Sequence, residues 1–242
     1  MLTKEYEIKF SEINYNNELK ETVFLNFLQD AAATNAEDNG FGYSFISKNN
    51  WAWFLLKYHL KIYNWPKKPQ KLTIKTWPKG ISKIYCLRDF EILDEKCNKI
   101  AVASSSWALL DIGTKKLISP KDAFEKIPIE DYTALETKFP KIELFTQPDT
   151  TKAFNIQYND IDINQHVNNA NYVDWALETL DFEFRTKNTI SEIQIHYKKE
   201  VKYGNEIVSE VKYSDENTTT LHSIKNKTTD EELCLIKIIW TN

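Results

Sequence analysis

Glycine is scarce in this chain, which has only 5 among 242 residues. The one Gly-x-Gly pair, Gly40 and Gly42, is followed by Phe45 where a dinucleotide-binding loop requires a third glycine. No Gly-x-x-x-x-Gly-Lys segment occurs, so the sequence has no P-loop nucleotide site either. With few glycines to free backbone amides in loops, we expect the chemistry to come from side chains and helix ends.

Cysteine pairs, long apolar runs and a basic excess are also missing. Cys86, Cys97 and Cys234 form no Cys-x-x-Cys pair, which argues against a disulfide framework and against a thiolate metal site. No apolar run reaches the ~18 residues of a membrane span, and the first ten residues lack the apolar core of a signal peptide. The net charge of −4 does not show the basic excess that is typical of nucleic-acid-binding proteins. We therefore expect a cytoplasmic protein with no membrane span and no nucleic-acid partner.

The apolar residues that are present follow two different periods. Residues 5–10 alternate between polar and apolar, which predicts a strand. From residue 19 to Asn39 the apolar spacing of one, three and four predicts a buried helix. Strand-like stretches follow at 53–63, 72–77, 84–93 and 100–110. One helix followed by several antiparallel strands indicates the α+β class.

The second half repeats this order. Residues 119–150 hold four of the chain's seven prolines and predict an extended linker. After them come a strand at 153–158, a helix at 168–180 and strands near 190–203, 205–213, 218–225 and 232–240. Residues 6, 8 and 10 align with residues of similar apolar character 148 positions later. We predict a duplication, with domains 1–118 and 151–242 joined by the linker and packed as a pseudo-dimer within one chain.

The two halves differ in polar chemistry just before their helices. In the second half Asp162, Asn164 and His166 alternate, and an extended segment would place all three side chains on one face. The start of the next helix adds free amide groups and the positive end of the helix dipole. A histidine, a carboxylate and amide donors suit the hydrolysis of an activated acyl group. The other interpretation stays open: Asp and Asn are also ordinary helix caps, and the histidine can be structural.

A family resemblance lies in these residues. The segment Asp162-Ile-Asn-Gln-His-Val-Asn-Asn-Ala-Asn-Tyr172 resembles the second-half motif of acyl-ACP thioesterases, the enzymes that end fatty-acid synthesis in plants and bacteria. Residues 53–62, 75–77, 88–89 and 103–111 are similar to first-half segments of that family. The resemblance implies two tandem hotdog folds, each a long helix wrapped by an antiparallel sheet. It also implies hydrolysis of a fatty acyl-ACP thioester, a reaction that needs no metal or nucleotide cofactor.

The resemblance also assigns site residues. Asp162, Asn164 and His166 match the family's catalytic positions, and Glu200 matches a catalytic glutamate. The family has a cysteine after that glutamate, whereas this chain has Val201, which cannot act as a nucleophile. The resemblance therefore favours water activated by Glu200 or His166. From the residues alone Glu200 is weaker, because extending the alternation of residues 193–197 puts it on the outer face, where a solvated strand end looks the same.

Further expectations concern substrate and partners. Trp53 and Phe27 are candidates for lining an acyl-chain site in the N-terminal domain, although both could belong to the core. Lysines together with Arg88 could receive an acidic carrier protein. The expected partner is acyl carrier protein bearing a fatty acyl-phosphopantetheine, and a homodimer is left open. The alternatives are an acyl-CoA thioesterase or another hotdog enzyme of acyl thioesters, and a non-catalytic acyl-thioester sensor or lipid-binding protein.

Overall fold

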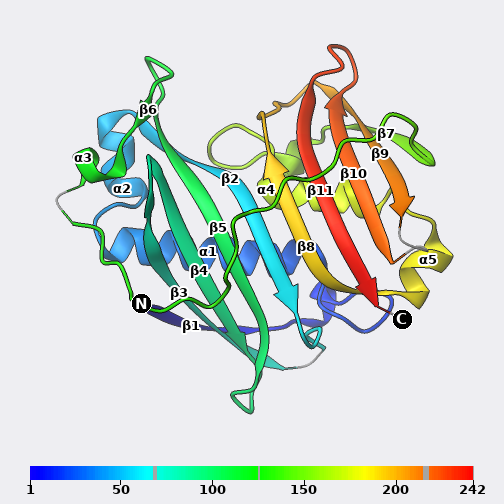
Figure 1. The fold of residues 1–242 in the computed structure, drawn as a ribbon, viewed down its shortest axis with the longest axis horizontal. Coiled ribbons are helices and arrows are strands. Elements are labelled where there is room, and N and C mark those ends of the chain that lie inside the picture. Colours follow the sequence, from blue (N-terminus) through cyan, green and yellow to red (C-terminus); the bar gives the residue numbers. More distant parts are fainter. Residues whose placement is uncertain (68–69, 125, 215–217, 242) are drawn as a thin grey trace. The chain divides into compact units, whose positions relative to one another are not determined.

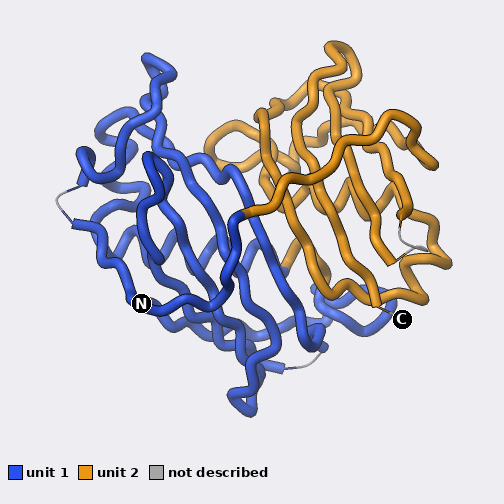
Figure 2. The backbone as a smooth tube through the Cα atoms, in the orientation of Figure 1, with its two compact units in different colours: residues 1–19, 24–138 blue, residues 20–23, 139–242 orange. Residues whose placement is uncertain are grey.

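The chain divides into two compact units, shown separately coloured in Figure 2. A computed structural model describes residues 1–67, 70–124, 126–214 and 218–241. Unit 1 comprises residues 1–19 and 24–138, and unit 2 comprises residues 20–23 and 139–242. The segment predicted as a linker is thus shared between the units, and the domain boundaries read from the sequence stay a prediction.

Unit 1 is an antiparallel sheet with one long helix (Figure 1). Its strands are paired in the order β1-β3-β4-β5-β2, and the short β6 pairs with β5. The elements are β1 (Leu2–Glu7), a 3-10 turn (Phe10–Glu12), α1 (Glu21–Asp38), α2 (Tyr43–Ile46), a second 3-10 turn (Ser47–Asn49), β2 (Trp51–Ile62), β3 (Lys71–Ser82), β4 (Tyr85–Leu93), β5 (Lys99–Asp111), β6 (Leu117–Ile118) and α3 (Pro120–Ala123).

Unit 2 repeats this topology. Its strands are paired in the order β7-β9-β10-β11-β8, so the first, third, fourth, fifth and second strands of each unit lie next to one another in turn. The elements are β7 (Thr150–Asn155), a 3-10 turn (Tyr158–Asp160), α4 (Asn169–Leu177), α5 (Phe182–Lys187), β8 (Thr189–Tyr197), β9 (Glu206–Ser214), β10 (Thr219–Asn226) and β11 (Glu232–Thr241). The α+β class and the two hotdog folds predicted from the sequence are confirmed.

The offset of 148 residues holds element by element at the start of each unit. β1 and β7 begin and end 148 residues apart, and so do the 3-10 turns that follow them. The first residues of α1 and α4 are separated by the same offset. A backbone bridge then closes the next turn in each unit, between Ile13 and Leu19 and between Ile161 and Val167. An identical turn in both units supports duplication of one ancestral unit.

Several sequence-derived bounds were wrong. The strands predicted at 5–10 and 153–158 end at Glu7 and Asn155, because a capping box closes a 3-10 turn after each. The strand predicted at 190–203 ends at Tyr197, and the helix predicted at 168–180 ends at Leu177. The short helix α5 was not predicted. The apolar pattern of a strand or helix can continue into the turn that follows it. The pattern therefore predicts the ends of strands and helices poorly.

The core of unit 1 lies between α1 and the sheet. The buried residues of α1 recur at three and four positions, and Phe24, Leu28 and Ala31 are completely buried. The segment predicted as a linker also contributes, because Phe124 and Leu135 are buried in unit 1 and Ile142 in unit 2. Figure 1 shows the part of this segment before β7 crossing unit 2 in front of its strands. Within the described ranges, no helix is both long and apolar enough to cross a membrane.

Candidate active site

A tight backbone turn in unit 2 carries three of the predicted residues. The amide of Asp162 donates to the carbonyl of His166 at 2.8 Å, and the amide of Gln165 donates to the carbonyl of Asp162 at 3.0 Å. Gln165 has a φ of 64°, in the left-handed region that residues other than glycine seldom adopt. The expectation of an extended segment with three side chains on one face was therefore wrong. The turn arises because these cross-turn bonds close the loop before the helix begins.

The side chains of Asp162 and Asn164 are paired directly. The Asp162 carboxylate accepts the backbone amide of Asn164 at 2.8 Å and the Asn164 side-chain amide at 3.3 Å. Asp162 thus fixes the position of the Asn164 carboxamide, which is exposed. Because that NH₂ group has two hydrogens, one can serve Asp162 while the other remains available to an acceptor.

The start of α4 lies directly after this turn. Asn168 is the N-cap residue, and its side chain accepts the amide of Ala170 at 2.9 Å. Its own amide donates to the carbonyl of Asp160 at 2.8 Å. The cap interpretation considered from the sequence therefore holds for Asn168, whereas Asp162 and Asn164 serve the turn rather than the helix.

Glu200 reaches the same place from a loop that follows β8. The amide of Val167 donates to the carbonyl of Val201 at 3.1 Å, and this bond joins the loop to the turn. The Tyr172 hydroxyl of α4 bonds the carbonyl of Lys199 at 3.5 Å. Glu200 lies beyond the end of β8, so the face assigned to it by extending the strand alternation was wrong. Its position is set by the loop and not by the pleat of the strand.

The loop brings Glu200 against His166. His166 Nε2 lies 3.3 Å from Glu200 Oε2, and the two side chains are 24% and 41% exposed. The other ring nitrogen, Nδ1, is buried. Nε2 therefore faces the carboxylate, which itself keeps contact with solvent. A carboxylate held at a histidine and open to water is suited to moving a proton between water and a bound acyl group.

Both halves of the chain match one protein family. Residues 1–127 match the family model described as the acyl-ACP thioesterase N-terminal domain, and residues 145–242 match the acyl-ACP thioesterase C-terminal domain. The chain belongs to the acyl-ACP thioesterase family. The resemblance noted in the sequence is confirmed.

Relatives within the acyl-ACP thioesterase family are distant in sequence. An oleoyl-acyl carrier protein thioesterase of Coriandrum sativum is 24% identical, over an alignment that covers 99% of this chain and 66% of the relative. An acyl-[acyl-carrier-protein] hydrolase of Cuphea viscosissima is 29% identical, over 76% of this chain and 46% of the relative. The chain thus spans about half to two thirds of the length of these curated relatives.

Solved structures of acyl-ACP thioesterases share the fold. An acyl-ACP thioesterase from Bacteroides thetaiotaomicron superimposes with a TM-score of 0.89 at 24% identity, covering 99% of this chain and 97% of the other. A 12:0-ACP thioesterase from Umbellularia californica gives a TM-score of 0.86 at 19% identity, covering 99% and 96%. At these identities the likeness establishes the fold alone.

The two candidates for lining an acyl-chain site lie in different surroundings. Trp53 packs against a buried apolar cluster of unit 1, stacks on Phe124 at 5.9 Å and donates its indole N–H to the carbonyl of Phe41 at 2.9 Å. Phe27 stacks instead on Tyr6 of β1, at 4.6 Å. Trp53 is thus placed beside other aromatic side chains that an apolar ligand could contact, whereas Phe27 packs on the edge strand.

Other polar candidates are structural. Arg88, considered from the sequence for a carrier-binding surface, is 5% exposed and cannot contribute to one. Burial raises the pKa of the Cys86 thiol to about 11, so this cysteine stays protonated at neutral pH. Among the described residues, no group of three His, Cys, Asp or Glu side chains is arranged to hold a metal ion.

Proposed function

We propose that this chain hydrolyses the thioester between a fatty acyl group and acyl carrier protein, releasing the free fatty acid. Membership of the acyl-ACP thioesterase family supports the reaction class. The observation that carries the proposal is the contact of 3.3 Å between His166 and Glu200, beside a turn that presents the Asn164 amide. These groups supply a base and an oxyanion donor, which thioester hydrolysis requires.

Glu200 is the proposed base. The buried Nδ1 of His166 is out of reach of water, and its Nε2 is directed to the carboxylate. Glu200 is the more exposed member of the pair, and its carboxylate can accept a hydrogen bond from a water molecule. His166 then orients the Glu200 carboxylate and shares the proton that the carboxylate accepts from water. The pair therefore acts as one proton-accepting unit.

The proposed reaction proceeds in two steps. Water attacks the thioester carbonyl carbon while Glu200 takes its proton, and the oxyanion formed accepts a hydrogen bond from the Asn164 amide. The oxyanion then collapses, the carbon–sulfur bond breaks, and the His166–Glu200 pair returns the proton to the leaving thiolate. Asp162 acts as a positioning residue, because it holds the Asn164 amide through a hydrogen bond of 3.3 Å. The products are a carboxylic acid and the free thiol.

Substrate carrier and location belong to the same proposal. Relatives named as thioesterases of oleoyl-acyl carrier protein and of 12:0-ACP support acyl carrier protein, rather than coenzyme A, as the carrier. The cytoplasmic location and the acyl-binding role of the N-terminal half remain predictions from the sequence.

The experiment compares Glu200→Gln with the wild type, using a panel of acyl-ACP and acyl-CoA thioesters and measuring free thiol release. Glu200→Gln keeps the size of the side chain but removes the proton acceptor, so we expect kcat to fall by about 10²–10⁴-fold. Glu231→Gln is the matched control, because Glu231 is also exposed and pairs with Lys199 next to the site. It should retain wild-type turnover.

Other outcomes would identify the rival functions. Faster hydrolysis of acyl-CoA than of acyl-ACP would assign the chain to acyl-CoA hydrolysis. Tight binding of acyl-ACP with no thiol release, unchanged in Glu200→Gln, would indicate a sensor and overturn the proposed reaction.

A further inference from the structure

The first turn of α4 forms hydrogen bonds with both segments that carry the candidate catalytic residues. Asn171 and Tyr172 are consecutive residues of this helix, and consecutive side chains of a helix point about 100° apart. Asn171 bonds the segment that leads into the candidate turn, and Tyr172 bonds the loop that carries Glu200. One helix turn is therefore bonded to the segment of His166 and to the loop of Glu200.

Asn171 holds the segment before the turn through Asp160. Its side-chain amide donates to the Asp160 carboxylate at 3.0 Å and to the Asp160 carbonyl at 3.3 Å. The same carbonyl accepts the backbone amide of Asn168 at 2.8 Å, and the other carboxylate oxygen accepts the amide of Gln157 at 2.6 Å. Asp160 is thus bonded to the helix and to the preceding 3-10 turn, two residues before Asp162 begins the candidate turn.

Glu200 is held through the carbonyl groups of both its neighbours in the chain. The Tyr172 hydroxyl donates to the carbonyl of Lys199 at 3.5 Å. The amide of Val167 donates to the carbonyl of Val201 at 3.1 Å. The ring of Tyr172 is buried and packs edge-on against two other aromatic rings, so its hydroxyl has a fixed position. The loop of Glu200 is therefore bonded to α4 on one side of the carboxylate and to the candidate turn on the other.

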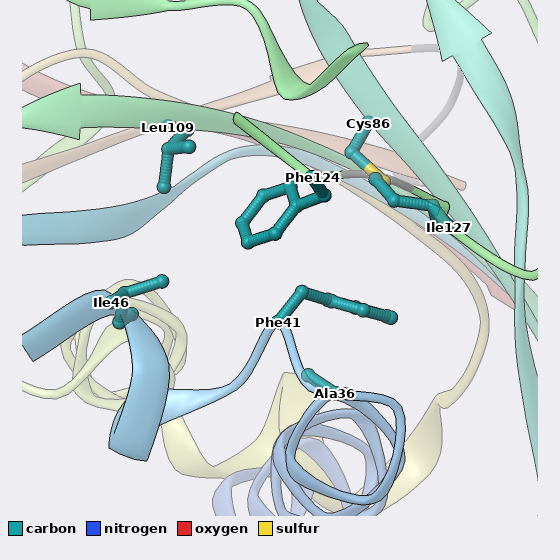
Figure 3. Close-up of a cluster of buried hydrophobic side chains, with 7 residues drawn as sticks. All are labelled: Ala36, Phe41, Ile46, Cys86, Leu109, Phe124 and Ile127. Atoms are coloured by element: carbon teal, nitrogen blue, oxygen red, sulfur yellow. The ribbon is translucent and has the colours of Figure 1, made fainter. Parts of the chain in front are cut away.

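The corresponding positions of α1 carry apolar side chains. Val23 corresponds to Asn171 at the offset of 148 residues, and Phe24 corresponds in the same way to the next residue, Tyr172. Neither valine nor phenylalanine has a hydrogen-bonding group in its side chain, and Phe24 is completely buried. Ala36, near the other end of α1, belongs to the buried apolar cluster that Figure 3 shows. Of the two helices, only α4 has hydrogen-bonding side chains at these two positions, and it follows the candidate turn.

We propose that Asn171 and Tyr172 are positioning residues, which set the separation within the proton-accepting pair. The inference rests on the proposed function, since it assigns what holds that pair together for the reaction. His166 and Glu200 both lie outside helices and strands, so their separation of 3.3 Å depends on how their two segments are held. Bonds from one helix turn to both segments keep that separation constant. A displacement of about 1 Å between reacting groups can lower a rate by about 100-fold.

The test replaces each residue by the one at the corresponding position of α1, as Asn171→Val and Tyr172→Phe. Asn171→Val removes two hydrogen bonds to Asp160, so we expect kcat for acyl-ACP to fall by about 10–100-fold. KM should stay within about twofold of the wild type, because the separation of the pair affects the transition state and not substrate binding. Tyr172→Phe removes one long hydrogen bond and should lower kcat by about 3–10-fold.

Asn188→Val is the matched control. Asn188 also donates from its side-chain amide to a backbone carbonyl, that of Phe184 at 2.8 Å, but it lies at the end of α5. This variant should lower the midpoint of urea unfolding about as much as Asn171→Val and leave kcat unchanged. An equal fall of kcat in both variants would show that any lost structural bond has this effect, and it would overturn the inference.

Crystal structures of the wild type and the variants measure the same separation without any substrate. We expect the distance between His166 Nε2 and Glu200 Oε2 to increase by about 1 Å in Asn171→Val. If that variant does not fold, Tyr172→Phe, which keeps the buried ring, provides the comparison. An unchanged distance, or an unchanged kcat, would overturn the inference. A longer distance in the variant, combined with a wild type that hydrolyses no thioester, would reject the proposed function alone.

Discussion

At the scale of single residues, His222 is a buried titratable group outside the candidate site. It lies in β10, is completely buried, and its Nε2 is 2.9 Å from the Thr220 hydroxyl. Burial lowers the pKa of His222 from 6.5 to about 3, so the ring is neutral in the folded protein down to acidic pH. In the unfolded chain the same ring takes up a proton near pH 6.5. The unfolded state therefore binds more protons between these two values, and folding stability falls as the pH drops through this range.

This linkage predicts an acid-sensitive stability. From pH 7.5 to pH 5 we expect His222 to lower the free energy of unfolding by about 2 kcal/mol. Urea unfolding at both pH values, for wild type and His222→Gln, measures the effect. The variant should lose this part of the pH dependence, because glutamine does not titrate. Equal pH dependence in the two proteins would contradict the prediction.

At the scale of elements, the same turn occurs once in each unit. Asn17 in unit 1 and Gln165 in unit 2 have φ values of 60° and 64°, and their amides donate to Asn14 and Asp162 in the same way. In both turns the first side chain accepts the backbone amide two residues later. Of the two turns, only that of unit 2 carries a histidine, and there Glu200 from a neighbouring loop lies against it. Both units thus have the same backbone turn, and the turn of unit 2 carries the candidate catalytic residues.

The repeated turn offers a matched pair of variants. Valine strongly disfavours a positive φ, so Gln165→Val and Asn17→Val should each lower the free energy of unfolding by about 1–3 kcal/mol. Only Gln165→Val should reduce kcat/KM, by about 100-fold, because it displaces Asn164 and His166. Thermal unfolding and steady-state kinetics of both variants provide the measurement. A comparable loss of activity in Asn17→Val would show that the turn of unit 2 has no special role.

At the scale of the whole molecule, the segment rich in proline is part of the packing. The sequence predicted an extended linker from 119 to 150, and most of that segment does lack regular structure. Even so, Ile142 is 1% exposed and packs with Leu221 and Leu235 on the unit 2 sheet, where Phe145 joins them. Proline-rich sequence indicates an absence of helix and strand, but not an absence of tertiary contacts.

Two neighbouring positions test this contribution. Ile142→Ala should lower the free energy of unfolding by about 2–5 kcal/mol, because it empties a fully buried position. Leu144→Ala is the control, since Leu144 is 63% exposed, and it should change stability by less than about 0.5 kcal/mol. Chemical denaturation of both variants measures their free energies of unfolding. Equal stabilities would mean that the segment does not contribute to the core of unit 2.

The sequence by itself determined the order of the main strands and helices, the repeat and the residues of the candidate turn. The spacing of apolar residues along a strand or helix depends on which face of that element is buried. Residues close together in the sequence are therefore enough to reveal it. The repeat is likewise visible in short stretches of sequence, because residues 6, 8 and 10 match residues 148 positions later.

Only the tertiary structure decided which distant residues meet. Glu200 reaches His166 because a loop bond joins Val167 to Val201, and strand alternation could not show this. Arg88, one of several basic residues in the sequence, becomes a buried cation through the pairing of β4 with β5 and its contact with α1. Such contacts depend on register and packing between elements, which no short stretch of sequence records.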